Sequence, residues 1–277
     1  MSAPVPRVSV CIPTYKGAQT IGAAIASVLA QTFTDFELLV IDDGSPDATA
    51  EVVAGFSDPR LRYLRNTTNL GPEGNWNRCL AEARGRYFKL LPHDDVLAPQ
   101  CLARQSAVLD ADRDDRIALV FSAREVIGPD DRVLTRRGYP GAREGRLPAG
   151  QVLRQCVRRG TNLLGEPGAV LFRRALAQRV GAFDARQPYV IDLDYWFRLL
   201  AHGDAYYCDE VLASFRVSAS QWSVALGRQQ SQDFRAFVAR HDAEGGLALS
   251  LLDRGLGRVT PALNNLARRV FYQVYLR

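Results

Sequence analysis

The chain has 277 residues, of which 47% are hydrophobic and 23% are charged. This length allows one large α/β domain or two small ones, and this composition excludes a disordered chain. The formal net charge of +5 comes from 35 Lys and Arg residues against 30 Asp and Glu residues. So small an excess fits a solvated surface. No basic patch interleaved with aromatic residues is evident, so no nucleic-acid partner is expected.

Signals for secretion, membrane insertion and disulfide formation are also missing from the sequence. Met1–Arg7 lacks the basic region and long apolar run of a secretory signal. No stretch approaches the ~20 apolar residues that a membrane-spanning helix needs. The five cysteines are widely spaced without a C-x-x-C pair, which argues against a disulfide framework and against a zinc site. We therefore expect a cytoplasmic protein.

Strand and helix patterns alternate along the first 125 residues. The expected strands are Val8–Ile12, Phe36–Ile41, Leu61–Leu64, Tyr87–Leu91 and Ile117–Val126. The expected helices are Ile21–Gln31, Ala48–Phe56, Glu73–Glu82 and Pro99–Leu109. This alternation predicts an α/β fold with a mostly parallel sheet covered on both faces. Ligands of such sheets bind beyond the carboxyl ends of the strands.

The pattern changes after Gly128. Pro129–Arg132 predicts a hairpin turn, and the Gly- and Arg-rich segment Gly138–Gly150 predicts a loop or mobile lid. Two helices are expected at Gln151–Arg159 and Asp194–His202, with an apolar run at Gly168–Phe172 between them.

The tail from Gln229 onward has a helical pattern and carries arginines and aromatic residues near its end. Such a helix could make peripheral contact with a membrane surface. A helix that packs on the body of the protein or on a second subunit is the simpler interpretation. Both interpretations stay open.

Asp94 and Asp95 follow the fourth expected strand directly. Adjacent carboxylates at the end of a buried strand repel each other unless a positive charge lies nearby. A divalent cation with oxygen ligands would supply that charge and would also bind a diphosphate. The alternatives are a solvated loop or a cap for the helix after Pro99.

Other polar residues are expected at the same edge of the sheet. The Asp43 carboxylate, after the second strand, could accept a hydrogen bond from the N–H of a nucleotide base. A simple turn into the next helix explains that residue nearly as well. Pro13 and Tyr15 follow the first strand, where the tyrosine ring could stack on a base.

Asp192 and Asp194 form a third acidic group, in the segment before and within an expected helix. A carboxylate at a helix N-terminus is stabilised in its ionised form and could take a proton from an attacking hydroxyl. An ordinary N-cap is the alternative, because aspartate is a favoured capping residue.

Taken in this order, the motifs resemble the inverting glycosyltransferases of family 2, which have a GT-A fold. The matching segments are Val8–Tyr15, Gln31–Glu37, Val40–Ser45, Asn69–Gly71, Tyr87–Asp95 and Asp192–Leu199. The resemblance implies a Rossmann-like, mostly parallel central sheet flanked by helices, with a C-terminal helical extension. It implies a nucleotide-sugar-binding half at residues 1–125 and an acceptor-binding half with the catalytic base at residues 126–225. Residues 226–277 would form the extension.

The resemblance also implies how a sugar is transferred from a nucleotide-sugar donor to an acceptor hydroxyl. Pro13, Tyr15 and Asp43 would contact the base and the ribose of the donor. UDP and dTDP are the favoured carriers. The acceptor would be a saccharide or a lipid-linked molecule, in the synthesis of bacterial surface polysaccharide or glycolipid.

In the implied reaction, Asp94 and Asp95 would bind Mn²⁺ or Mg²⁺ together with the diphosphate of the donor. Asp94 would also contact the donor itself. Asp192 matches the catalytic base, and Asp194 or the apolar run after it would shape the acceptor side. Transfer would invert the anomeric configuration without a covalent intermediate.

Two positions depart from the family pattern. Pro92 occupies the first position of the D-x-D element, and Ser218 stands where many members carry a metal-binding histidine. Arg216 is a candidate diphosphate partner. The segment Thr161–Gly168 could line the acceptor pocket with Glu166 facing in, or it could form a structural turn before the strand Ala169–Phe172. The departures put metal affinity in question.

Two other functions compete with the transferase. A sugar nucleotidyltransferase would carry a glycine-rich, basic loop after the first strand, and only one glycine is present in Pro13–Gly17. A non-catalytic module that binds nucleotide-sugars is the other alternative, motivated by Pro92 and Ser218.

Overall fold

The alternating pattern of the sequence produces one ten-stranded sheet in the computed structural model, which describes residues 5–218 and 229–275. The strands are β1 (Val8–Thr14), β2 (Phe36–Asp42), β3 (Leu61–Arg65), β4 (Tyr87–Leu90), β5 (Val96–Leu97), β6 (Ile117–Ile127), β7 (Val133–Arg137), β8 (Gly145–Leu147), β9 (Val170–Arg173) and β10 (Asp204–Arg216). Their main order across the sheet is β3-β2-β1-β4-β9-β6-β10-β5.

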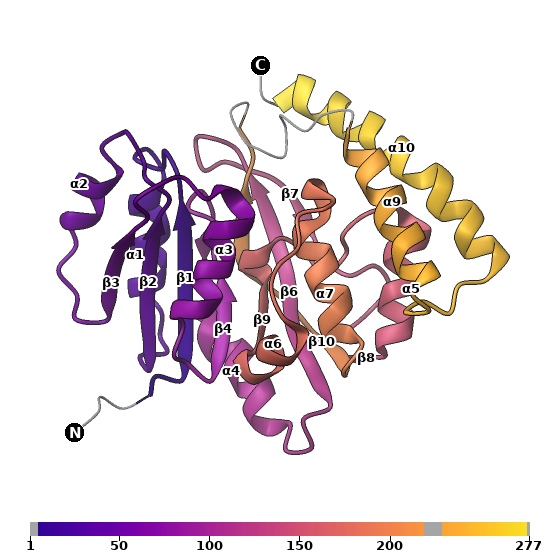
Figure 1. Ribbon diagram of the computed structural model, residues 1–277, viewed down its shortest axis with the longest axis horizontal. Coiled ribbons are helices and arrows are strands. Elements are labelled where there is room, and N and C mark those ends of the chain that lie inside the picture. The colour runs from indigo at the N-terminus through magenta and orange to yellow at the C-terminus, as the bar shows by residue number, and fades with distance from the viewer. Residues whose placement is uncertain (1–4, 219–228, 276–277) are drawn as a thin grey trace.

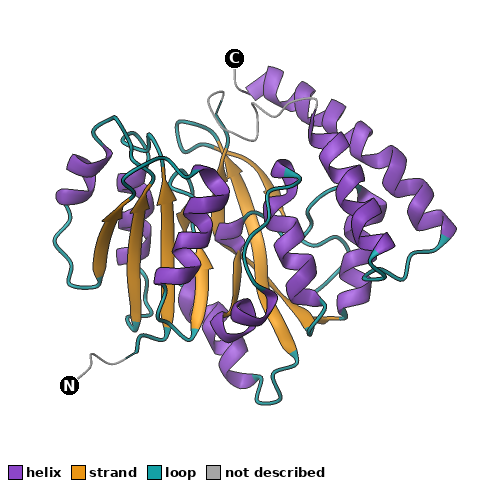
Figure 2. Ribbon diagram, viewed as in Figure 1, coloured by secondary structure: helices purple, strands orange, loops and turns teal. Residues whose placement is uncertain are grey.

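Helices cover both faces of this sheet (Figure 2). They are α1 (Ile21–Leu29), α2 (Thr49–Ala54), α3 (Gly71–Glu82), α4 (Cys101–Ala111), α5 (Ala149–Arg159), α6 (Arg174–Val180), α7 (Ile191–Leu200), α9 (Gln229–Ala243) and α10 (Leu251–Tyr275), with the short helices η1 (Pro167–Ala169) and η2 (Pro188–Val190).

Strand directions divide the sheet into two parts. The strands β3, β2, β1 and β4 are all parallel to one another. β9 runs antiparallel to both β4 and β6, so β4 and β6 point the same way, and β10 is parallel to β6. The carboxyl ends of β1, β2, β4, β6 and β10 therefore meet at one edge.

Side chains alternate between two apolar cores because successive residues of a strand point to opposite faces. Val10 and Ile12 pack with α1 and α4 on one face, whereas Cys11 lies with α3 and α7 on the other. All seven residues of β1 are buried, as they are in β2. Burial on both faces explains the continuous apolar runs that predicted these strands.

The predicted fold class is confirmed, and so is the hairpin turn at Pro129–Arg132, which joins β6 to β7. The prediction of a loop or lid over Gly138–Gly150 is wrong in part. Gly145–Leu147 forms β8 on the edge of β10, and α5 already begins at Ala149. β8 is held by backbone hydrogen bonds to β10, which do not require apolar side chains. The Gly- and Arg-rich composition of the segment therefore did not predict a strand.

The expected division after residue 125 falls inside β6, which continues to Ile127. The two halves are thus parts of one sheet. The second expected boundary, between residues 225 and 226, lies outside the described residues. Helices α9 and α10 form the C-terminal extension and lie at the end of the sheet opposite β3 (Figure 1). Within residues 5–218 and 229–275, no helix is long and apolar enough to cross a membrane.

Candidate active site

Asp43 lies at the carboxyl end of β2 and organises the turn between β3 and α3. Its Oδ1 accepts hydrogen bonds from the Asn66 side chain at 2.5 Å and from the Leu70 backbone N–H at 2.8 Å. Its Oδ2 accepts from the backbone N–H of Gly71 at 2.9 Å. A carboxylate has about four acceptor positions, so these bonds leave capacity for one more donor at Oδ2. Contact between Asp43 and a base stays a prediction.

Asp42, the residue before Asp43, has a structural role in the turn after β2. Asp42 is fully buried and accepts bonds from the Ser45 backbone N–H at 2.8 Å and the Tyr63 hydroxyl at 2.5 Å. Neither aspartate caps α2, whose N-cap position is occupied by Ala48. These two adjacent carboxylates therefore fix the loops around the edge of the sheet.

The loop after β1 borders the same region. Pro13 is buried within β1, whereas the Tyr15 side chain is exposed and accessible to a stacking partner. Gly17 lets this loop approach the loop after β4, because a Cβ atom at position 17 would lie 3.0 Å from the His93 ring and 2.3 Å from Thr14 Oγ1. The first and fourth strand ends are thus in direct contact.

Asp94 and Asp95 have different surroundings. Asp95 is 2% exposed, and its Oδ1 accepts a hydrogen bond from the Arg216 backbone N–H at 3.0 Å. Burial and the neighbouring Asp94 carboxylate raise the pKa of Asp95 well above its usual range. Asp94 is half-buried. Of the two predicted metal ligands, Asp94 is the more accessible, and neither caps α4.

Arg216 ties the end of β10 to this acidic loop. Its Nε donates to the Asp94 carbonyl at 2.9 Å, Nη1 donates to the Gly128 carbonyl at 3.1 Å, and Nη2 pairs with Asp131 at 2.7 Å. The guanidinium is therefore engaged by protein groups on all three nitrogens. This observation assigns Arg216 to holding the Asp94 loop and weighs against its predicted contact with a diphosphate.

A divalent ion at this edge would need ligands from outside the protein. In the described part of the chain, no group of three or more His, Cys, Asp or Glu side chains is placed to hold a metal ion. Mg²⁺ sites commonly use one or two carboxylates and take the remaining oxygens from substrate phosphates and water. Asp94, as a half-buried carboxylate at the end of β4, fits a site of that kind.

Glu166 precedes η1 and pairs with Arg124 of β6, whose side chain is 4% exposed. Burial acts to raise the pKa of Glu166, but the Arg124 and Arg137 charges outweigh it and lower the pKa. Glu166 interacts electrostatically with both Asp95 and Asp192. It therefore lies near both of the acidic groups that the sequence predicted separately.

Asp192 lies in the first turn of α7 and is half-buried. Its Oδ2 accepts a hydrogen bond from the Asn162 side chain at 2.9 Å, and its Oδ1 accepts from the Leu193 N–H at 2.7 Å. Burial and the charge of Glu166 raise the pKa of Asp192 to about 7. Residue Val190 occupies the N-cap position, so the capping interpretation of Asp192 is wrong.

Asp194 belongs to the core and has a structural environment. Its Oδ2 accepts from Arg198 at 2.8 Å, and its Oδ1 contacts Arg240 at 2.5 Å and His241 at 2.9 Å. Arg240 and His241 lie on α9, far along the chain. Because its carboxylate is 2% exposed and is shared by these groups, the implied role of Asp194 on the acceptor side is not supported.

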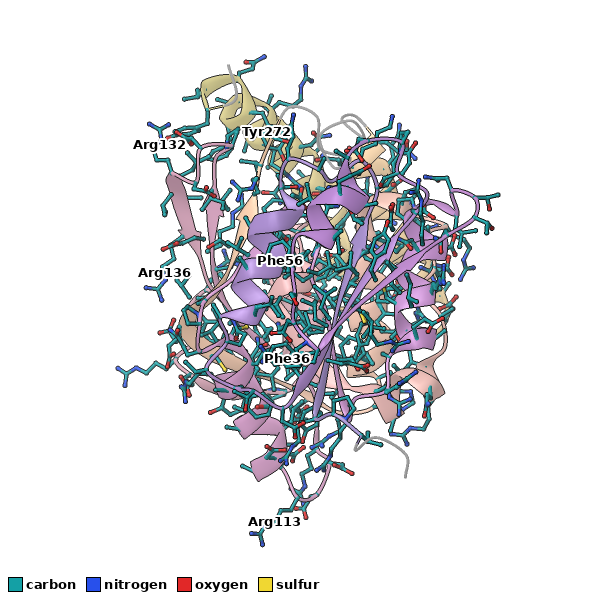
Figure 3. The ribbon with its side chains drawn as sticks, turned by 90° about the vertical axis from the view of Figure 1, so that its left-hand side faces the viewer. Phe36, Phe56, Arg113, Arg132, Arg136 and Tyr272 are labelled. Carbon is teal, nitrogen blue, oxygen red and sulfur yellow. The ribbon has the colours of Figure 1, made fainter. Side chains whose placement is uncertain are left out.

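Some residues of this region carry no signal in the sequence. Arg124 belongs to no motif, and only the fold brings it beside Glu166. Asn162 lies in the segment expected to line the acceptor pocket, but its contact with Asp192 also depends on the fold. Arg268 and Tyr272 of α10 also interact electrostatically with Glu166. Figure 3 shows Tyr272 at the same end of the molecule as Arg132 of the β6–β7 turn, with Arg113 at the opposite end. Helix α10 thus reaches the acidic edge.

Comparison with known proteins identifies the family. Residues 9–181, well over half of the chain, match the family model described as glycosyl transferase family 2. The chain belongs to this family. It spans 62% to 65% of the length of three bacterial relatives, from Mycobacterium tuberculosis and two Rickettsia species, to which it is 29% to 35% identical.

Further relatives of this glycosyltransferase family member differ in how much they share. The Escherichia coli protein named UDP-Glc:alpha-D-GlcNAc-diphosphoundecaprenol beta-1,3-glucosyltransferase WfgD is 37% identical over 120 residues, which are 43% of this chain and 46% of that protein. The fold matches TarS of S. aureus, solved with UDP-GlcNAc, at a TM-score of 0.70 and 16% identity over 98% of this chain and 76% of that one.

A second solved structure extends this likeness. The mannosyltransferase PcManGT from Pyrobaculum calidifontis, in complex with GDP-Man and Mn²⁺, matches at a TM-score of 0.66 and 17% identity. The match covers 97% of this chain and 76% of that chain. At such identities the comparison establishes the shared GT-A fold.

Proposed function

We propose that this protein is an inverting glycosyltransferase that moves a sugar from a nucleotide-sugar to an acceptor hydroxyl, with Asp192 as the catalytic base. The observation that carries the proposal is the environment of Asp192. Its carboxylate is half-buried at the start of α7, held by Asn162, and has its pKa raised to about 7. A general base works best when its pKa lies near the working pH.

The donor site would lie at the ends of β1, β2 and β4. Tyr15 offers an exposed ring for stacking on a base, and Asp43 Oδ2 retains acceptor capacity for a base N–H. UDP or dTDP is the proposed carrier. The UDP-sugars named for TarS and WfgD support this choice.

Asp94 would hold Mn²⁺ or Mg²⁺ together with the donor diphosphate, and the Mn²⁺ in PcManGT supports this assignment. The ion, when bound, would offset the negative charge that develops on the departing nucleoside diphosphate. Asp95 would position the metal-binding loop, because its buried carboxylate accepts a hydrogen bond from the Arg216 backbone and the Arg216 side chain in turn binds the Asp94 carbonyl.

In the proposed step, the oxygen of the acceptor hydroxyl attacks the anomeric carbon. A carboxylate oxygen of Asp192 takes the proton of this hydroxyl during the attack. The bond between this carbon and the diphosphate oxygen breaks on the opposite side, so the configuration inverts. Asn162 and the Leu193 N–H keep the carboxylate oriented during the transfer. The acceptor would be a saccharide or a lipid-linked molecule in bacterial polysaccharide or glycolipid synthesis, as the name of WfgD suggests.

Donor binding can be tested by thermal unfolding with a panel of nucleoside diphosphates and nucleotide-sugars, with and without Mn²⁺. A ligand at a hundred times its Kd adds about 2.7 kcal/mol to the free energy of unfolding. We expect the matching nucleotide to raise the melting temperature by several degrees, and only when Mn²⁺ is present. Asp94→Ala should abolish this shift, because Asp95, the neighbouring carboxylate, is buried.

The matched control is Asp114→Ala, which removes an exposed aspartate before β6, at the amino edge of the sheet. This variant should keep the full nucleotide shift. A nucleotide that stabilises wild type and Asp94→Ala equally without metal would remove the metal assignment and keep the donor site. If no nucleotide raises the melting temperature, the proposed donor site is wrong. The chain would then not bind a nucleotide-sugar donor, and the proposed transfer reaction would fail with it.

The rate of transfer should depend on pH through Asp192. The base is active when ionised, so kcat/KM should rise about tenfold per pH unit below about 7 and level off above it. Glu166→Gln removes a negative charge that raises the pKa of Asp192, so the rising limb should move to lower pH. A limb that stays in place in this variant would contradict the assignment of Asp192 as the titrating group.

A further inference from the structure

Helix α10 presents a continuous apolar face to solvent. Nine of its side chains are large, hydrophobic and exposed, whereas the remainder of the described chain has four such side chains. We name seven of the nine the α10 stripe: Leu252, Leu256, Val259, Leu263, Leu266, Val270 and Val274. At 100° per residue, these seven positions lie within about 80° of one another around the helix. They therefore form a single line along its outer side.

The inner side of α10 has the opposite character. Gly257 and Pro261 are buried against the end of α5, where a Cβ atom on Gly257 would lie 2.8 Å from Val157. Asn264 donates hydrogen bonds to the Arg159 and Gly160 carbonyls, and buried Asp253 pairs with Arg158. A helix on a protein surface normally turns its apolar side to the core.

These inner contacts fix the rotation of α10 about its own axis. If the helix turned to bury its leucines, Asp253 and Asn264 would lose their partners on α5. The ribbon in Figure 1 shows α10 as the outermost helix beside α9, on the side away from β1–β3. The fold thus holds the α10 stripe outward through specific polar contacts.

The charges beside the stripe have one sign. Arg258 and Arg269 are exposed and lie along one border of the stripe. Arg254 is also exposed and pairs with Asp242 of α9, and the single acid of α10, Asp253, is buried. A helix with an apolar face bordered by arginines matches the pattern that lies in the interface of an anionic membrane.

We propose that α10 docks this protein on an anionic lipid bilayer, with the α10 stripe in the acyl boundary and the arginines at the lipid headgroups. This binding does not depend on the proposed transfer reaction. Because the Arg268 guanidinium of the same helix lies 5.3 Å from the centre of the Tyr189 ring, in η2 directly before α7, the bilayer would lie beside the Asp192 end of the site. A lipid-linked acceptor would then reach that end directly.

The test is co-sedimentation of the full chain with vesicles of phosphatidylcholine alone or mixed with phosphatidylglycerol. We expect binding to the mixed vesicles, and Leu263→Gln with Leu266→Gln should weaken it at least about tenfold. Arg258→Gln with Arg269→Gln should weaken it on the order of tenfold. NaCl at about 1 M should also weaken binding, because it shortens the Debye length to about 3 Å.

Val5→Gln is the control for the leucine replacements, because Val5 is an exposed aliphatic side chain that precedes β1 and does not belong to α10. It should leave vesicle binding unchanged. All of the replaced side chains are exposed, and an unchanged thermal melt confirms that each variant is folded. Equal binding to neutral vesicles would overturn the electrostatic part of the proposal. Absence of vesicle binding, with a wild-type dimer that Leu263→Gln dissociates, would assign the stripe to a second copy and overturn the proposal.

Discussion

Asp192→Asn should lower the rate of sugar transfer by about 10² to 10⁴, the range expected for loss of a general base. The substitution keeps the size of the side chain and an acceptor for the Asn162 or Leu193 donor, but it removes the group that takes the proton. The measurement is kcat/KM for release of the nucleoside diphosphate, made above pH 7, where wild-type Asp192 is ionised.

The stability of this variant separates lost chemistry from lost folding. Because the pKa of Asp192 is raised in the folded state, the folded protein holds its proton more tightly than the unfolded chain between about pH 4 and pH 7. The free energy of unfolding therefore falls as pH rises through this range, and Asn removes that cost. Above pH 7 we expect Asp192→Asn to be at least as stable as wild type and to keep its nucleotide-dependent thermal shift. Undiminished transfer by a folded Asp192→Asn protein would remove Asp192 from the reaction.

The sequence predicted the architecture because local patterns determine it. β1 and β2 are buried on both faces, so their residues form short apolar runs that polar turns interrupt. Parallel strands place those turns at one edge, so the sequence alone assigns Asp43 and Asp94 to a common region. The sequence pattern did not distinguish the two carboxylates, because they differ in exposure: Asp95 is buried, whereas Asp94 is only half-buried.

The acceptor side of the edge could not be predicted in the same way. Glu166 and Arg124 meet across 42 positions of the chain, and Asp194 meets His241 across 47. No periodicity encodes such pairings, which depend on how β6, η1, α7 and α9 pack in three dimensions. The amphipathic pattern of α10 was visible in the sequence, but only its packing on α5 shows which side faces outward.

Asp194→Ala should lower the free energy of unfolding by about 3 to 5 kcal/mol, because it leaves buried cations without their partner. Burial opposes ionisation of Asp194, but the His241 hydrogen bond and the Arg198 and Arg240 charges outweigh it and lower its pKa to about 2. Such a group stabilises the fold above its unfolded pKa near 4, and this contribution disappears as pH falls toward 2. The loss in Asp194→Ala should therefore be complete at pH 7 and shrink in acid.

Urea unfolding at pH 7 and at pH 3 measures this difference, and Asp242→Ala is its control. Asp242 also lies on α9, and it pairs with Arg254 at the surface, where water screens the interaction, so its removal should hardly change the unfolding midpoint. An Asp194→Ala protein as stable as the control would show that α9 packs on α7 without this cluster. The expected loss instead means that this buried carboxylate helps α9 to hold α7, and with it Asp192, in place.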